Sequence, residues 1–156
     1  MATNDLPAID LSIPDHQASL DKLISFFETI SLAACQDLSG IYTEDAYFKD
    51  PFNELRGLPA INQVFQHMFV QVHEPHFRIT SSVLQNDSAF LVWDFLFTMK
   101  NFSAATQRIR GATHIRFADD GRVNFHRDYW DAAEELYEKL PVLGSFMRFL
   151  KSQARK

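Results

Sequence analysis

The apolar residues in the first half of the chain recur at the spacing of two amphipathic helices. One series begins after Asp15, and the other follows Gly57-Leu58-Pro59, where a proline in the first helical turn costs no hydrogen bond. In both series the intervals are three or four residues, so the side chains share one face of a helix. The two series are Leu20, Leu23, Ile24, Phe27 and Ile30, and then Ile61, Val64, Phe65, Met68 and Val72. Pro75 closes the second helix.

The second half of the chain changes to the period of two that is typical of β-strands. The strands predicted from this period cover residues 76–85, 88–100, 106–118 and 122–131. A short strand at 46–50 precedes Pro51, and Asn86-Asp87 is a turn signal between the first two long strands. Two helices followed by a run of neighbouring strands predict a single α+β domain.

The two ends of the chain are predicted to lie outside the domain core, which covers 17–131. Residues 1–16 contain two prolines and three aspartates, and we expect a flexible arm. Residues 132–156 carry a leucine-rich stripe with a basic end, and we expect a helical extension of the same domain. This extension is expected to pack over the open end of the domain or on a partner subunit. An interfacial membrane helix is an alternative interpretation of the same stripe.

Composition and charge narrow the function classes. Of the 156 residues 46% are apolar, the formal net charge is −5, and no basic patch precedes the last dozen residues, which argues against nucleic acid as a partner. The single cysteine, Cys35, cannot form an intrachain disulfide and fits a reducing compartment. Without a signal-peptide pattern or an apolar run of about 18 residues, we expect a cytoplasmic protein with no membrane span. The six histidines lack metal-binding spacing, so neither a metal nor a cofactor is expected.

The segment 42–65 carries a motif that points to a family. It has an aromatic residue, an acidic pair followed by alanine, a strand that ends in Asp-Pro, and then Gly-x-x-Ala-Ile-x-x-x-Phe. These residues are Tyr42, Glu44, Asp45, Ala46, Asp50, Pro51, Gly57, Ala60, Ile61 and Phe65. The pattern resembles the nuclear transport factor 2-like superfamily, which includes SnoaL-like and ketosteroid isomerase-like domains. The resemblance implies a cystatin-like cone, in which a strongly bent mixed or antiparallel sheet wraps around N-terminal helices.

Two enzyme classes of this superfamily imply roles for particular residues. Resemblance to the ketosteroid isomerases places Asp50 at the position of the proton-abstracting aspartate. It also implies a set of pocket-lining residues, namely Phe90, Val92, Asp94, Leu96, Thr113, His126, Asp128 and Trp130. Resemblance to the limonene-epoxide hydrolases implies that Asp94 and Asp128 are the catalytic acid pair. The isomerase's oxyanion tyrosine falls near Phe26 or Phe27 and the hydrolase's bridging arginine falls at Val92, so both catalytic sets are incomplete.

Strand alternation supports the acid pair from the residues alone. Asp94 shares one face of its strand with Phe90 and Val92, and Asp128 shares a face with His126. A carboxylate among apolar neighbours is costly unless it is paired, hydrated or protonated. We expect the two carboxyl groups to face one apolar pocket, one protonated and one ionised, with His126 tuning the proton. The alternative is that they form ion pairs with arginines, for which the candidates are Arg78, Arg110 and Arg127.

The other face of the strand at 88–100 is apolar as well. It carries Leu91, Trp93, Phe95 and Phe97, and a homodimer through this sheet face is the simplest way to cover it.

These patterns favour a protein that binds a small lipophilic molecule in an acidic and apolar pocket. Asp94 and Asp128 would transfer protons, in chemistry of the isomerase or epoxide-hydrolase kind, and His126 would assist them. The predicted ligand-binding residues are Asp50, Phe90, Val92, Thr113 and Trp130. The alternatives are a non-catalytic ligand-binding or dimeric accessory protein and, with less support, a protein-interaction module.

Overall fold

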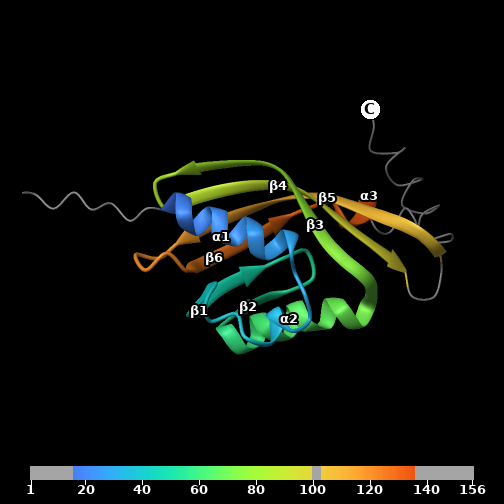
Figure 1. Cartoon of the computed structure of the whole chain (residues 1–156), viewed down its shortest axis with the longest axis horizontal. Coiled ribbons are helices and arrows are strands. Elements are labelled where there is room, and N and C mark those ends of the chain that lie inside the picture. The colour runs from blue at the N-terminus through green and yellow to red at the C-terminus, as the bar shows by residue number, and fades with distance from the viewer. Residues whose placement is uncertain (1–15, 100–102, 136–156) are drawn as a thin grey trace, which may run out of the picture.

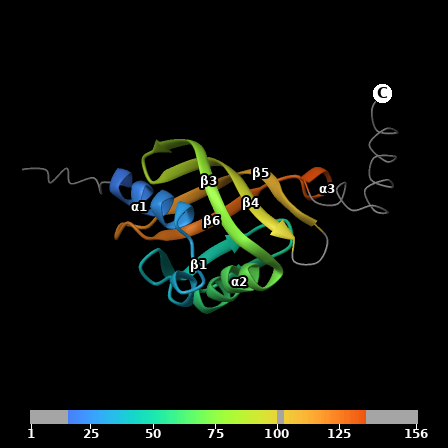
Figure 2. The same cartoon turned by 45° about the vertical axis from the view of Figure 1, so that its right-hand side comes forward.

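The computed structural model describes residues 16–99 and 103–135, which form one bent sheet with two helices on its inner side (Figure 1). In chain order the elements are α1 (His16–Glu28), the 3₁₀ turn η1 (Ala34–Gln36), β1 (Tyr42–Lys49), β2 (Glu54–Arg56), α2 (Leu58–Gln71), β3 (Val72–Gln85), β4 (Ser88–Met99), β5 (Ser103–Phe117), β6 (Val123–Tyr129) and α3 (Ala132–Glu135). Helix α1 packs against β3, and α2 packs against β1 and β3. Figure 2 shows both helices lying within the curve of the sheet.

The six strands lie in the order β2-β1-β6-β5-β4-β3. Strands β1 and β6 are parallel, and the other neighbouring strands are antiparallel. The parallel pair places Phe48 of β1 opposite His126 of β6. The register shifts between Ile79 and Ser81 in β3, and such irregularities increase the local bend of a sheet.

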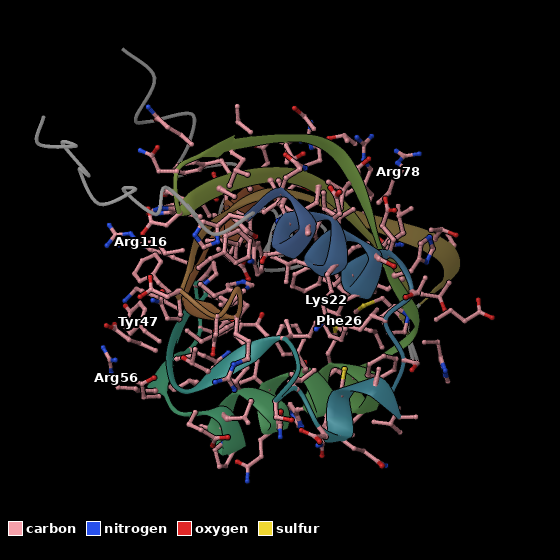
Figure 3. The ribbon with its side chains drawn as sticks, turned by 60° about the vertical axis from the view of Figure 1, so that its left-hand side comes forward. Lys22, Phe26, Tyr47, Arg56, Arg78 and Arg116 are labelled. Atoms are coloured by element: carbon pink, nitrogen blue, oxygen red, sulfur yellow. The ribbon has the colours of Figure 1, made fainter. Side chains whose placement is uncertain are left out.

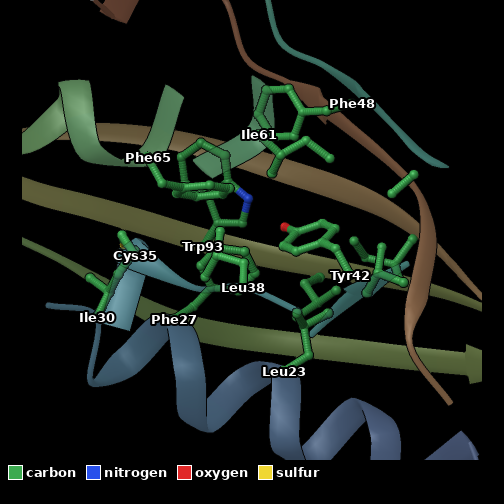
Figure 4. Packing of buried hydrophobic residues seen from close by; sticks show 14 of the residues in the cluster. Leu23, Phe27, Ile30, Cys35, Leu38, Tyr42, Phe48, Ile61, Phe65 and Trp93 are labelled. Carbon is green, nitrogen blue, oxygen red and sulfur yellow. The ribbon is translucent and has the colours of Figure 1, made fainter. Parts of the chain in front are cut away.

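The hydrophobic core lies between the helices and the inner face of the sheet (Figure 4). Helix α1 contributes the buried side chains of Leu20, Leu23 and Phe27, and α2 contributes Ile61 and Phe65. These residues belong to the apolar stripes read from the sequence, so each helix buries the face that its periodicity predicted. The sheet contributes the aromatic residues Tyr42, Phe48 and Trp93 to the same core.

The predicted α+β fold class is confirmed, and the structure corrects several details. Strand β1 begins at Tyr42, four residues before the prediction, and β2 was not predicted. Strand β3 begins at Val72 and runs through Pro75, which the sequence placed at the end of a helix. Proline fits there because β3 is at the edge of the sheet, where a missing N–H breaks no pairing. Residues 1–15 of the predicted N-terminal arm, and the predicted extension after Glu135, lie outside the described residues. His16, the last residue of the predicted arm, is buried and begins α1.

The assignment of the two faces of β4 was wrong. Leu91, Trp93 and Phe97 are buried and face the helices, whereas Phe90 and Val92 lie on the outer face of the sheet and are 48% and 47% exposed. The stripe that contains Trp93, Phe95 and Phe97, predicted to form a dimer interface, is therefore on the core side. The residues on both faces of β4 are largely apolar, so alternation alone did not show which face meets the helices.

Candidate functional site

A buried chain of hydrogen bonds runs from β1 to the carboxylate of Asp128. The hydroxyl of Tyr42 lies 2.9 Å from Nδ1 of His126, and Nε2 of the same imidazole lies 2.9 Å from Oδ1 of Asp128. The sheet order makes this contact possible, because the parallel pairing of β1 and β6 brings Tyr42 beside a residue 84 positions later. Tyr42 and His126 are almost completely buried.

A second branch reaches the same carboxylate oxygen from the neighbouring strands. Nε1 of Trp93, on β4, donates to Oγ1 of Thr113 at 2.7 Å, and Thr113 donates to Oδ1 of Asp128 at 2.5 Å. Leu91, Thr113 and Asp128 are direct partners across β4, β5 and β6, so their side chains share the inner face.

The directions of the hydrogen bonds between Tyr42, His126 and Asp128 depend on which of these groups carry protons. Burial, assisted by the negative charge of Asp128, raises the pKa of Tyr42 well above its usual value, so the phenol keeps its proton. The arrangement in which Tyr42 donates to Nδ1 of His126, and Nε2–H donates to Asp128, gives each group in this chain a partner. The rings of Phe27, Phe48 and other aromatic residues surround this imidazole. His126 and Asp128 therefore form a hydrogen-bonded pair of ionisable groups in apolar surroundings, which we call the dyad.

Asp128 borders two cavities of very different size. The inner cavity, lined by residues such as Phe27, Trp93 and His126, offers about 20 Å³ to the centre of a water-sized molecule. That is room for about one water. The outer groove offers about 480 Å³. It is lined by Pro51, Tyr129 and Trp130 and by the charged residues Lys49, Asp50, Arg127, Asp128 and Asp131. Asp128 is the residue that the linings of these two cavities share.

Asp94 does not join Asp128, so the predicted acid pair is absent in this geometry. It lies on the outer face of β4, where Nη2 of Arg78 donates to Oδ2 at 2.5 Å and Nε of Arg108 donates to Oδ1 at 2.7 Å. The alternative of an ion pair describes Asp94 correctly, and Arg78 was one of the three arginines named for it. The hydrogen bond from Arg78, with a further contribution from Arg108, lowers the pKa of Asp94.

The Asp94 ion pairs should stabilise the fold in a pH-dependent way. A carboxyl group whose pKa is lowered on folding stabilises the native state fully above its unfolded pKa of about 3.9, and this stabilisation disappears as the pH falls through the folded pKa. We therefore expect Asp94→Asn to lower the free energy of unfolding by a constant amount near neutral pH, and by progressively less below about pH 4. Urea unfolding of both proteins over this range measures the difference. A difference that does not change with pH would contradict the assignment.

The other predicted site residues lie in three places. Trp130 and Asp50 line the outer groove, but both oxygens of Asp50 accept hydrogen bonds from Asn53, so Asp50 holds a turn. Thr113 lines the inner cavity, and its predicted role as a ligand-binding residue stays a prediction. Phe90 and Val92 are on the outer face and cannot line either cavity, which corrects their predicted role.

Two residues of the site were not found from the sequence. Tyr42 was recognised as part of the family motif, but its strand was predicted to begin after it. Trp93 was placed on the wrong face. The signal that could have identified Tyr42 is its hydroxyl group. The other buried aromatic or aliphatic residues of β1, Ala46 and Phe48, have no polar side-chain atom.

The described residues give no indication of a metal centre or a membrane helix. In residues 16–99 and 103–135, no three His, Cys, Asp or Glu side chains are grouped so as to hold a metal ion. None of the helices within these two ranges is long and apolar enough to cross a bilayer.

Comparison with solved structures finds the same fold in several proteins. A protein with a ketosteroid isomerase-like fold from Catenulispora acidiphila, solved in complex with trimethylamine, is 14% identical and superposes with a TM-score of 0.64 over 80% of this chain and 92% of its own. An NTF2-like protein of unknown function from Exiguobacterium is 18% identical, with a TM-score of 0.62 over 72% and 98%. An LEH-like epoxide hydrolase from M. tuberculosis is 12% identical, with a TM-score of 0.60 over 77% and 85%. At these identities the likeness concerns the fold alone.

Comparison of sequences is more specific. A search of curated proteins finds no match. The model of the SnoaL-like domain family matches residues 23–126, which include β1 to β5 and extend to His126 of the dyad. Because this match spans well over half of the chain and agrees with the observed cone of helices and sheet, the chain belongs to the SnoaL-like domain family.

Proposed function

We propose that this protein binds a small, largely apolar molecule in the outer groove and transfers a proton with Asp128 as the general base. The observation that carries the proposal is the His126–Asp128 dyad, which lies in apolar surroundings and borders the groove. The names of two proteins with this fold, a putative polyketide cyclase and an LEH-like epoxide hydrolase, agree with acid–base chemistry. They do not select one reaction.

The hydrogen bonds favour a base over an acid. Oδ1 of Asp128 accepts from both His126 and Thr113, and two donors are best satisfied by an ionised carboxylate. No described residue donates to Oδ2, which leaves that oxygen available to a ligand. A positioned carboxylate with one free oxygen is able to remove a proton from a carbon acid or from water.

The sizes of the cavities indicate where the ligand lies. The inner cavity has room for about one water, which is too small for a lipophilic ligand. The outer groove is in the size range of small-molecule sites, and it combines the apolar surfaces of Pro51, Tyr129 and Trp130 with charged groups. The ligand body therefore occupies the groove with its reacting group at Asp128.

The test is a direct search for product. The purified protein would be incubated with a cyclic terpene epoxide and with a β,γ-unsaturated ketone, and the products would be separated by chiral gas chromatography. Conversion of either compound above the buffer rate, with stereochemical preference, is the expected result. Binding of both compounds without conversion would contradict proton-transfer chemistry on these substrate classes.

A second candidate function is ligand binding without catalysis. It is favoured by the position of Asp94, because the acid that was predicted to complete the catalytic pair is held by two arginines on the other face. Binding of the same compounds in a calorimetric titration, with no conversion by the wild-type protein, would support this function. Conversion that Asp128→Asn removes while binding is retained would support the first.

We also propose that two copies associate through the outer face of the sheet. Val83 and Phe90 are strand partners there, and Val92, Ala112 and Tyr129 form the adjacent row. Four of these side chains, all except Ala112, are between 47% and 65% exposed. The long strands β3, β4 and β5 supply most of this face, and an ordinary interface buries about 800 Å² per partner.

An acidic residue in the apolar centre of this face should weaken the association of the two copies. Figure 3 shows Tyr47, Arg56, Arg78 and Arg116 projecting on the outer side of the sheet, away from the helices. We expect Phe90→Asp to convert a dimer into a monomer, as measured by light scattering during gel filtration, because a carboxylate that replaces the apolar ring would have to lose its hydration in the interface. Leu32→Asp is the control, since Leu32 is 49% exposed but lies outside the sheet. A Phe90→Asp protein that remains dimeric would contradict this interface.

A further inference from the structure

We infer that Gly111, Trp93 and Thr113 form a positioning chain that sets the orientation of the Asp128 carboxylate. The catalytic meaning of this chain rests on the proposed function, but its effect on Asp128 does not. Thr113 was predicted to bind the ligand. In the structure its hydroxyl is used within the protein, so it acts through Asp128.

The direction of the chain is fixed by Trp93. An indole N–H is only a donor, so Oγ1 of Thr113 must accept at the 2.7 Å contact between them. The hydroxyl proton of Thr113 is then directed toward Oδ1 of Asp128, 2.5 Å away. Trp93 and Thr113 are 6% and 4% exposed, so water does not easily replace either partner.

Gly111 leaves space for the indole of Trp93 because it has no side chain. It is the strand partner of Trp93, and a Cβ at position 111 would lie 2.4 Å from the indole ring. The ring of Phe77 meets the indole edge-on, with 5.5 Å between the ring centres. The indole is thus confined between β5 and Phe77, and this position aims its N–H at Thr113.

The consequence for Asp128 is an asymmetric carboxylate. With Thr113 and His126 both bound to Oδ1, rotation of the carboxyl group would break two hydrogen bonds at once. Oδ2 is therefore the oxygen that meets a ligand. Loss of the Thr113 donor should free the rotation and favour the protonated form of Asp128, because a donor to the ionised form stabilises it.

The test compares two substitutions at one position. Thr113→Val removes the hydroxyl and keeps the shape, whereas Thr113→Ser keeps the hydroxyl and removes a methyl group. We expect the ¹³Cγ resonance of Asp128, followed by NMR in the ligand-free protein, to titrate at higher pH in Thr113→Val than in the wild type. In Thr113→Ser the titration should remain near that of the wild type. Equal titrations of Asp128 in all three folded proteins would overturn the inference.

Trp93 and Gly111 provide an independent arm. Trp93→Phe removes the N–H, and Gly111→Ala displaces the indole, so both should shift the Asp128 titration in the same direction as Thr113→Val. If Gly111→Ala does not fold, the Trp93→Phe protein still gives the answer. An unchanged titration in folded Trp93→Phe would remove Trp93 and Gly111 from the chain.

Kinetic measurements separate this inference from the proposed function. Where a substrate is converted, we expect Thr113→Val to lower kcat roughly tenfold with little change in KM, since a hydrogen bond to a charged group is worth about one order of magnitude or more. Thr113→Ser should recover most of that loss. If Asp128 titrates as expected but no compound is converted, the positioning chain stands and the proposed catalysis is wrong.

Discussion

Asp128→Asn is expected to lower turnover by about 10²- to 10⁴-fold while the protein remains folded, which is the usual contribution of a positioned general base. Asparagine keeps an oxygen that can accept the hydrogen bonds of His126 and Thr113. It replaces the free Oδ2 with an amide nitrogen that cannot take a proton. Rates with a converted epoxide or ketone, together with circular dichroism of both proteins, measure the effect.

Asp94→Asn is the matched control, because the sequence assigned both aspartates the same role. Asp94 is on the outer face with Arg78 and Arg108, so its replacement should leave turnover within about threefold of the wild type. Equal losses in the two variants would show that the inner dyad is not the centre of the chemistry. Unchanged rates in both would exclude Asp128 as the base.

Tyr42→Ala is expected to destabilise the protein by roughly 3–5 kcal/mol, the range for removing a large aromatic side chain from a core. Tyr42 is completely buried and contacts the rings of Phe65 and His126. The loss is a large fraction of the 5–15 kcal/mol that typically stabilises a domain. Equilibrium unfolding in urea, monitored by tryptophan fluorescence, measures it.

Tyr42→Phe separates the hydrogen bond from the packing. It keeps the ring but leaves Nδ1 of His126 without its donor, so we expect a smaller loss of about 1–3 kcal/mol. If Tyr42→Phe is as destabilising as Tyr42→Ala, the hydrogen bond to His126 outweighs the packing of the ring. If it is as stable as the wild type, the phenol is not a partner of the imidazole.

The sequence predicted the helices and much of the site because their signals are local. The stripes of α1 and α2 repeat over several turns, and Gly57 and Pro59 mark where the second helix begins. The inward side chains of β6 were also identified, since His126 and Asp128 alternate with the outward Arg127. These inferences needed only neighbouring residues.

The predictions that failed depended on contacts between distant strands. Strand β4 is apolar on both faces, so the position of Asp94 depends on which face meets the helices, and that is decided by α1 and β3. The role of Tyr42 depends on the pairing of β1 with β6, which no local pattern reveals. The three-residue strand β2 is too short to show a period.

The parallel pairing of β1 with β6 has a consequence for how the chain reaches its native state. Tyr42 pairs with Val123, so β1 cannot complete its hydrogen bonds until almost the whole domain is available. Contacts between residues so far apart slow folding, because a long loop must close before they form. We expect β3, β4 and β5 to assemble first as antiparallel neighbours, with the insertion of β1 as the late step. During synthesis on the ribosome, the edge of β1 that pairs with β6 would remain without its partner until β6 emerges.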